Sequence, residues 1–197
     1  VMVEYASPNT NKPLHVGHLR NLALAKSIIR LFEHEGNRVV KVQVINDRGV
    51  HICKSMLAYQ KWGRGTTPEK EKMKSDHLVG KFYTEFTLRA VVEPMLEDEA
   101  QAMLVKWENG DVETRKIWRL MNDWAEKGLF ETYAAFGSEF DKNYYESEFY
   151  SKGKEVVMKA FAEGKLEKAE NGAIMVPLKK YNLPDKPVIR GDGTSLY

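Results

Sequence analysis

The chain has 197 residues, of which 43% are hydrophobic and 29% are charged, a balance that excludes an intrinsically disordered protein. Its 30 Lys and Arg against 28 Asp and Glu leave a net charge of +2, which indicates no particular partner. The single cysteine, Cys53, excludes an internal disulfide and a zinc site of several thiolates, so we expect a reducing, cytoplasmic setting. No stretch of about 18 apolar residues occurs, and we therefore expect neither secretion nor a membrane span.

The first elements along the chain are predicted to be a strand, a loop, a helix and a second strand. Residues 1–6 are β-branched and aromatic, and the prolines and small polar residues of 7–13 end the strand. From Gly17 to Gly36 apolar residues recur three or four positions apart, which is typical of an amphipathic helix. Residues 38–45 then alternate as a strand. This βαβ pattern predicts an α/β fold that opens as half of a doubly wound parallel sheet.

Ligands of such sheets bind outside the carboxyl ends of the strands, which here precede residues 7–18 and 46–49. His15 and His18 lie where the first of these loops enters the helix, and a helix N-terminus binds phosphate. Both rings can donate hydrogen bonds to phosphoryl oxygens during in-line attack. Gly17 between them leaves room for a flat base.

Lys12, on the same loop, adds a mobile positive charge. None of these groups is a covalent nucleophile, so the chemistry indicated is positioning and charge stabilisation. The two histidines have no third ligand evident in the sequence, and we expect no metal site here.

After Trp62 the composition changes to a breaker cluster and a charged stretch, which we interpret as the start of an insertion. The region from Gly80 to Gly137 is predicted to be mainly helical, with one helix ending at Gly128. Ser151 is expected to cap a helix that continues to residue 162.

Asn171-Gly172 then joins two short strands as a hairpin, and residues 188–197 resemble another hairpin or the beginning of a strand. We therefore divide the chain into three parts. Residues 1–62 form the first half of a nucleotide-binding fold, residues 63–150 a mainly helical insertion, and residues 151–197 a helix, a hairpin and the beginning of the second half. Because the sheet is unfinished, we expect the sequence to be a fragment of a longer protein.

Residues 7–21, Ser-Pro-Asn-Thr-Asn-Lys-Pro-Leu-His-Val-Gly-His-Leu-Arg-Asn, resemble the signature loop of arginyl-tRNA synthetases. These are class I aminoacyl-tRNA synthetases whose HIGH motif follows a Ser-Pro-Asn-x-x-Lys-Pro stretch. Residues 46–49, 140–147 and 192–197 match further segments in the family's order. The resemblance covers essentially the whole chain. It implies the first half of a Rossmann-like class I synthetase catalytic domain with a largely helical insertion, and it places the KMSKS-type loop and the anticodon-binding domain outside these residues.

The resemblance also implies roles for the residues that match. His15 and His18 would hold the ATP phosphates, and Gly17 would leave room for adenine. Val16 replaces the isoleucine of the motif conservatively. Lys12 matches a lysine that assists catalysis where the KMSKS-type loop lacks its usual lysine.

For the amino acid, the resemblance implies that Asn9 binds the α-amino group with Ser7 beside it, since an amide oxygen accepts from an ammonium. Glu146 matches the acid that pairs with the substrate guanidinium, because a carboxylate accepts an arginine fork. The surrounding residues are richer in tyrosine than the family pattern, so Glu148 and Asp141 remain alternatives for this role.

Two further residues complete the expected arginine pocket. Tyr197 matches a family tyrosine after Asp-Gly-Thr-x-Leu, with a plain strand aromatic as the alternative. Asp47 either lines the pocket or fixes Arg48, and the sequence leaves both readings open.

The implied function is that of an arginine–tRNA ligase in translation. ATP with Mg2+ and L-arginine would be its small substrates, tRNA(Arg) its macromolecular one, with no prosthetic group and no membrane. We expect these residues alone to be inactive, because the family generally needs bound tRNA for the first step. The alternatives are another nucleotidyltransferase of the HIGH superfamily and a non-catalytic relative that binds RNA or protein.

Overall fold

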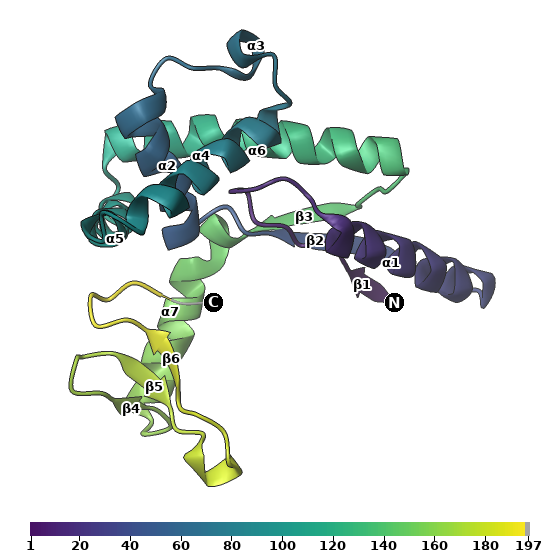
Figure 1. The fold of residues 1–197 in the computed structure, drawn as a ribbon. Coiled ribbons are helices and arrows are strands. Elements are labelled where there is room, and N and C mark those ends of the chain that lie inside the picture. Colours follow the sequence, from purple (N-terminus) through teal and green to yellow (C-terminus); the bar gives the residue numbers. More distant parts are fainter. Residues whose placement is uncertain (196–197) are drawn as a thin grey trace. The chain divides into compact units, whose positions relative to one another are not determined.

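The computed structural model describes residues 1–195 and divides into two compact units (Figure 1). The first unit is Val1–Glu146, and the second begins at Ser147. Each unit is described by itself below.

The first unit contains a three-stranded sheet in the order β1-β2-β3, with all strands parallel. The strands are β1 (Met2–Glu4), β2 (Val40–Ile45) and β3 (Lys142–Tyr145). The helix α1 (Val16–His34) connects β1 to β2, which is the βαβ arrangement that the sequence predicts. The third strand lies in a stretch for which the sequence analysis predicts no strand.

Helix α1 packs on the sheet through one apolar stripe. Leu22, Ala25 and Ile29, spaced three or four residues apart, are its buried positions. They form a core with Tyr5, which follows β1, and with two residues of a long helix later in the chain, Leu129 and Tyr133.

A cluster of helices lies between β2 and β3 in the chain (Figure 1). Its α-helices are α2 (Val50–Ala58), α3 (Pro68–Glu71), α4 (Ser75–Ala90), α5 (Met95–Glu108) and α6 (Val112–Phe136), and a π-helical turn, Tyr59–Gly63, follows α2. Helix α2 packs against α4 and α5, and α4 packs against α6. The helices bury their own apolar core, with Met56, Leu78, Phe86 and Leu104 at or near full burial. The mainly helical character of this region agrees with the sequence.

The expectation that a helix ends at Gly128 is wrong, because α6 continues through this residue to Phe136. The glycine serves close packing instead. A Cβ on Gly128 would lie 2.4 Å from Oδ1 of Asp76, which is 1% exposed on α4. Lys74 Nζ lies 3.0 Å from Oδ2 of the same aspartate. The absent side chain therefore lets α6 approach a part-buried ion pair, in which Asp76 is the buried member.

We expect Gly128→Ala to lower the free energy of unfolding of the first unit by about 1–2 kcal/mol. Overpacking costs about 1–3 kcal/mol, and the better helix propensity of alanine returns up to about 1 kcal/mol. Urea denaturation followed by tryptophan fluorescence measures this unit, because Trp62, Trp107, Trp118 and Trp124 all belong to it. Gly153→Ala is the control, since a Cβ on that helical glycine has no neighbour within 4 Å. Equal midpoints for both variants would contradict the packing role of Gly128.

The second unit consists of α7 and a three-stranded antiparallel sheet in the order β4-β5-β6. The strands are β4 (Glu167–Lys168), β5 (Ile174–Val176) and β6 (Lys186–Ile189), with a short 3-10 helix, Lys179–Tyr181, before the last strand. The expected turn at Asn171-Gly172 joins β4 to β5, and Gly172 has a φ of 84° that favours glycine.

Helix α7 (Glu146–Ala162) ends where the sequence predicts but begins five residues before Ser151, so the cap expected at that serine is wrong. Glu146 and Glu148 lie in its first turn, where carboxylates interact favourably with the helix dipole. Of the helices formed by residues 1–195, none is long and apolar enough to cross a membrane.

Candidate active site

The loop after β1 is fixed against the end of β2 by backbone and side-chain hydrogen bonds. Asn9 and Asn46 form an isolated parallel bridge. The backbone N–H of Thr10 donates to the carbonyl of Asn46 at 3.1 Å, and that of Asn46 donates to the carbonyl of Pro8 at 3.0 Å. The loop therefore runs along the carboxyl edge of the parallel sheet, the edge at which the sequence predicts ligand binding.

His15 and His18 cap the N-terminus of α1 reciprocally. Nδ1 of His15, the N-cap residue, accepts from the backbone N–H of Gly17 at 3.1 Å. Nδ1 of His18 accepts from the backbone N–H of His15 at 3.2 Å, and the two ring centroids are 4.0 Å apart. A Cβ on Gly17 would lie 2.9 Å from Cε1 of His15, so glycine is what allows this ring to fold back onto the helix.

This capping determines which nitrogen of each ring can donate. Because both Nδ1 atoms accept backbone N–H groups, Nε2 is the ring nitrogen of His15 and of His18 that carries a proton. Burial lowers the pKa of His18 below its ordinary value, and the charges of His15 and Lys12 lower it further, so the neutral form prevails at pH 7. Two Nε2–H donors therefore lie at the positive end of the helix dipole.

Lys12 lies half-buried on the same loop, next to Pro13 and against helix α4. The contact is made at Gly80, where a Cβ would lie 2.6 Å from Cδ of Pro13 and 3.6 Å from Cα of Lys12. The sequence analysis uses Gly80 only as the start of a helical region and misses this contact. Nothing in the local pattern signals it, because the partner is 67 positions away in the chain.

The expected amino-group ligands have different surroundings. Oδ1 of Asn9 accepts from Nδ2 of Asn46 at 3.0 Å, and an amide oxygen has a second lone pair for a further donor. The hydroxyl of Ser7 donates to Oε1 of Glu4 at 2.8 Å and accepts from the backbone N–H of Val44 at 3.2 Å. Ser7 therefore has a structural role in joining β1 to β2.

Asp47 and Arg48, just after β2, are 3% and 4% exposed. The backbone carbonyl of Asp47 accepts from Nε1 of Trp118 at 2.6 Å and from Nδ2 of Asn122 at 3.3 Å, both on α6. These bonds attach the end of β2 to the helical cluster.

Glu146 lies at the end of β3, where its side chain is 14% exposed. Its Oε1 accepts from Nη1 of Arg48 at 3.1 Å, while its Oε2 is buried and has no hydrogen-bond partner within residues 1–195. The pKa of Glu146 lies above its ordinary value because burial raises it most; the charge and hydrogen bond of Arg48 lower it, and the charge of Asp47 raises it. A buried carboxylate oxygen without a donor is costly, which makes it a ready acceptor for a ligand.

The two alternatives to Glu146 lie elsewhere. Oδ2 of Asp141 accepts from the backbone N–H of Lys41 at 2.7 Å, at the amino ends of β2 and β3 and therefore at the opposite edge of the sheet. Glu148 is exposed on α7. Tyr197 lies outside the described residues.

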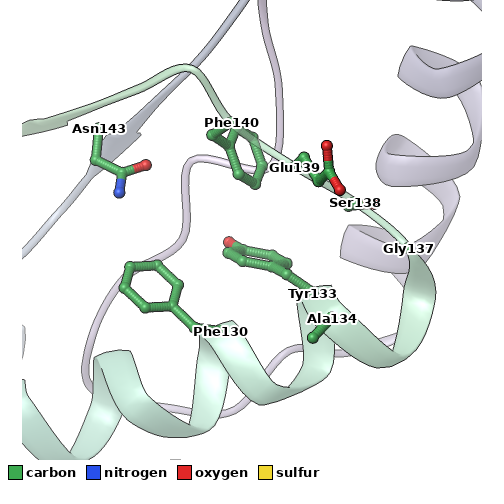
Figure 2. Close-up of a pocket in the computed structure, with 8 residues that line it drawn as sticks. All are labelled: Phe130, Tyr133, Ala134, Gly137, Ser138, Glu139, Phe140 and Asn143. Atoms are coloured by element: carbon green, nitrogen blue, oxygen red, sulfur yellow. The ribbon is translucent and has the colours of Figure 1, made fainter.

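A cavity of about 420 Å³, shown in Figure 2, is also found in the first unit. Phe130 and Tyr133 of α6 and Phe140 form part of its wall, and Asn143 of β3 lies at one side. Most of its lining precedes or begins β3, which places the cavity near the amino end of that strand. None of the residues that the sequence analysis expects to bind a substrate lines it.

The structure thus brings most of the predicted residues to one edge of a parallel sheet. Asn9, His15, Gly17 and His18 follow β1, Asp47 follows β2 and Glu146 follows β3. A parallel sheet with a helix N-terminus at its carboxyl edge is the arrangement of doubly wound α/β domains. Within this class, the chain belongs to the family of class I tRNA synthetases (R), catalytic domain, whose model matches residues 1–197. The resemblance inferred from the sequence and the α/β fold class are confirmed.

Individual relatives agree with the family. The arginine–tRNA ligase of Treponema denticola is 51% identical over 199 residues, covering 100% of this chain and 34% of that protein. The arginine–tRNA ligase of Parabacteroides distasonis is 46% identical over 214 residues, covering 100% of this chain and 36% of that protein. The chain therefore spans about a third of the length of these relatives.

Solved structures show the same fold. Thermus thermophilus arginyl-tRNA synthetase superposes with a TM-score of 0.70 at 24% identity, covering 100% of this chain and 34% of that one. Arginyl-tRNA synthetase from Plasmodium falciparum superposes with a TM-score of 0.71 at 22% identity, covering 100% of this chain and 32% of that one.

Proposed function

We propose that this chain supplies the ATP-binding and arginine-binding part of an arginine–tRNA ligase. The observation that carries the proposal is the buried oxygen Oε2 of Glu146, which has no hydrogen-bond partner within residues 1–195 and lies on the same sheet edge as the His15–His18 helix terminus. A carboxylate oxygen of arginine attacks the α-phosphorus of ATP, and the bond from that phosphorus to the bridging oxygen breaks to release pyrophosphate. A terminal ribose hydroxyl of tRNA(Arg) then attacks the carbonyl carbon of the adenylate, and AMP leaves.

The phosphate side of the site uses the start of α1. The Nε2–H groups of His15 and His18 donate to phosphoryl oxygens whose charge grows as pyrophosphate departs. Lys12 adds a positive charge from the neighbouring loop, and Gly17 leaves space for adenine. Mg2+ arrives as part of the ATP complex, held by phosphate oxygens and water. No prosthetic group is needed for this chemistry.

The amino-acid side of the site uses the ends of the strands. Asn9 accepts from the α-ammonium group through the second lone pair of its amide oxygen, with Ser7 shaping the turn beside it. Oε2 of Glu146 accepts from the guanidinium, and the charges of the two groups complement each other. Asp47 completes the pocket among the described residues, and Tyr197 keeps the role in arginine binding that the family resemblance implies. We place this reaction in the cytoplasm, where a free, buried thiol such as Cys53 stays reduced.

The experiment compares L-arginine with citrulline, which has nearly the same size but no guanidinium charge. The protein expressed from its complete gene is assayed for ATP–pyrophosphate exchange with tRNA(Arg) present. We expect exchange with arginine and none with citrulline. No arginine-dependent exchange from a folded protein would refute the proposed function.

Glu146→Gln keeps the size of the side chain and one acceptor for Arg48, but it removes the charge. A charge-assisted hydrogen bond is worth about 1.5–3 kcal/mol, so the KM for arginine should rise roughly 10- to 100-fold. Glu113→Gln is the matched control, since the Glu113 side chain is 72% exposed on α6. An unchanged KM for arginine in Glu146→Gln would show that a different acidic residue pairs with the guanidinium.

A further inference from the structure

Arg48 forms the centre of a buried charge triad that the sequence analysis does not identify. Its guanidinium bonds Glu146 through Nη1 and Glu108 through Nη2. The side chains of the three residues are 2%, 14% and 12% exposed, in the order Arg48, Glu146 and Glu108. The triad joins the end of β2, the start of α7 and the last residue of α5.

We propose that Arg48 and Glu108 are positioning residues for arginine recognition, which hold Glu146 with one oxygen occupied and the other open to the substrate. This inference rests on the proposed function. Arg48 contacts Glu146 directly, and Glu108 contacts Arg48. Neither residue is proposed to contact the substrate.

The placement of the two bonds supports this role for Arg48. Nη1 occupies only Oε1 of Glu146, and Oε2 has no hydrogen-bond partner within residues 1–195. Glu108 draws the other amino group to itself, so that Arg48 does not bind both oxygens in the bidentate geometry that the two groups favour. Burial raises the pKa of Glu146 above its ordinary value, and the charge and hydrogen bond of Arg48 offset part of this rise, which favours the ionised form that a cation needs.

Glu108 has a second role, which is to give the triad a negative net charge. A pair of Arg48 and Glu146 alone is neutral and has no electrostatic preference for a cation. Glu108 adds one negative charge, so the triad carries a net charge of −1, and the neighbouring charge of Asp47, which also acts on Glu146, adds to the preference for a cation. Because the triad is buried, its charges interact more strongly with a bound cation than they would in water.

Glu108 is in an unfavourable position for helix stability. It is the last residue of α5, where a carboxylate meets the negative end of the helix dipole. Arg48 compensates for this, and its guanidinium also lies 5.9 Å from the ring centroid of Trp107, the preceding residue of the same helix. The C-terminal end of α5 therefore contacts Arg48, which in turn holds Glu146.

The test uses Glu108→Gln and Arg48→Lys in the protein expressed from its complete gene, with arginine-dependent ATP–pyrophosphate exchange as the assay. Glu108→Gln keeps a hydrogen-bond acceptor but loses the charge. Arg48→Lys keeps the charge but cannot bond two carboxylates in the same fork. The matched control is Glu97→Gln, which removes another ion pair between α5 and α2, with a carboxylate that is 49% exposed.

We expect both triad variants to raise the KM for arginine about tenfold, the effect of losing one net hydrogen bond to a charged group. The KM for ATP and kcat should stay within about twofold, because the phosphate side of the site is untouched. The preference for arginine over citrulline, measured as the ratio of their dissociation constants by titration of the same protein, should fall by the same factor in Glu108→Gln. Glu97→Gln should match the wild type in all of these values.

An unchanged KM for arginine in both folded variants would overturn the positioning role and leave the proposed function standing. A parallel loss of every kinetic parameter with a lower melting temperature would also overturn it, because a purely structural ion pair acts in that way. If Arg48→Lys fails to fold, Glu108→Gln decides between these outcomes. Absence of arginine-dependent exchange in the wild type would instead refute the proposed function itself.

Discussion

His15→Asn should lower kcat of arginine-dependent ATP–pyrophosphate exchange by about 100-fold while the melting temperature of the protein stays unchanged. Asparagine is as good an N-cap as any residue, so its side chain can accept from the backbone at the start of α1 as His15 Nδ1 does. It has no group in the place of Nε2–H. Removing one donor to a developing negative charge typically costs about 100- to 1,000-fold.

His15→Ala separates the two roles of the residue, since it loses the cap as well as the donor. It should show the same loss in kcat with an additional loss of about 1 kcal/mol in the free energy of unfolding. His34→Ala is the control, because His34 is an exposed residue in the last turn of the same helix. Full activity in His15→Asn would show that the Nε2–H group does not act on the phosphates.

Gly80→Ala should lower kcat by about 10- to 100-fold with little change in the KM for arginine. The new Cβ would lie 2.6 Å from Cδ of Pro13, so the loop that carries Lys12 must move away from α4. A displacement of about 1 Å in a positioning element can cost up to about 100-fold in rate. Steady-state exchange kinetics with varied ATP and arginine measure the effect.

The control for this substitution is again Gly153→Ala, in which a helical glycine with no neighbour within 4 Å gains the same methyl group. It should leave all kinetic parameters unchanged. If Gly80→Ala and Gly153→Ala behave alike, the contact between α4 and the loop does not position Lys12, and the lysine is held by the loop alone.

Some of the fold follows from local sequence. The stripe formed by Leu22, Ala25 and Ile29 has the helical period, and the loop of residues 7–13 contains two prolines that a strand does not continue through. Asn171-Gly172 gives the turn between β4 and β5 because glycine adopts the positive φ found there. Each of these signals lies within one element or one turn.

Other features depend on partners that are distant in the chain. Gly128 has the composition of a helix end, yet α6 continues through it because Asp76 of α4 occupies the space a side chain would take. Ser151 is a good capping residue, but α7 has already begun at Glu146, directly after β3. In both cases tertiary packing outweighs a local preference of about 1 kcal/mol.

The same distinction applies to the candidate site. The sequence by itself predicts the loop, its two histidines, the lysine and Glu146 as site residues, with Glu148 and Asp141 as alternatives to Glu146, because these residues are contiguous or belong to matching segments. The structure shows that His15 and His18 cap one helix with Nε2 left to donate, a local contact, whereas only the tertiary structure decided that Gly80 supports the loop. It also decided that Arg48 and Glu108, 60 positions apart, share one buried charge cluster with Glu146. Such contacts are set by how α4 and α5 pack over the end of the sheet, and no local pattern encodes that packing.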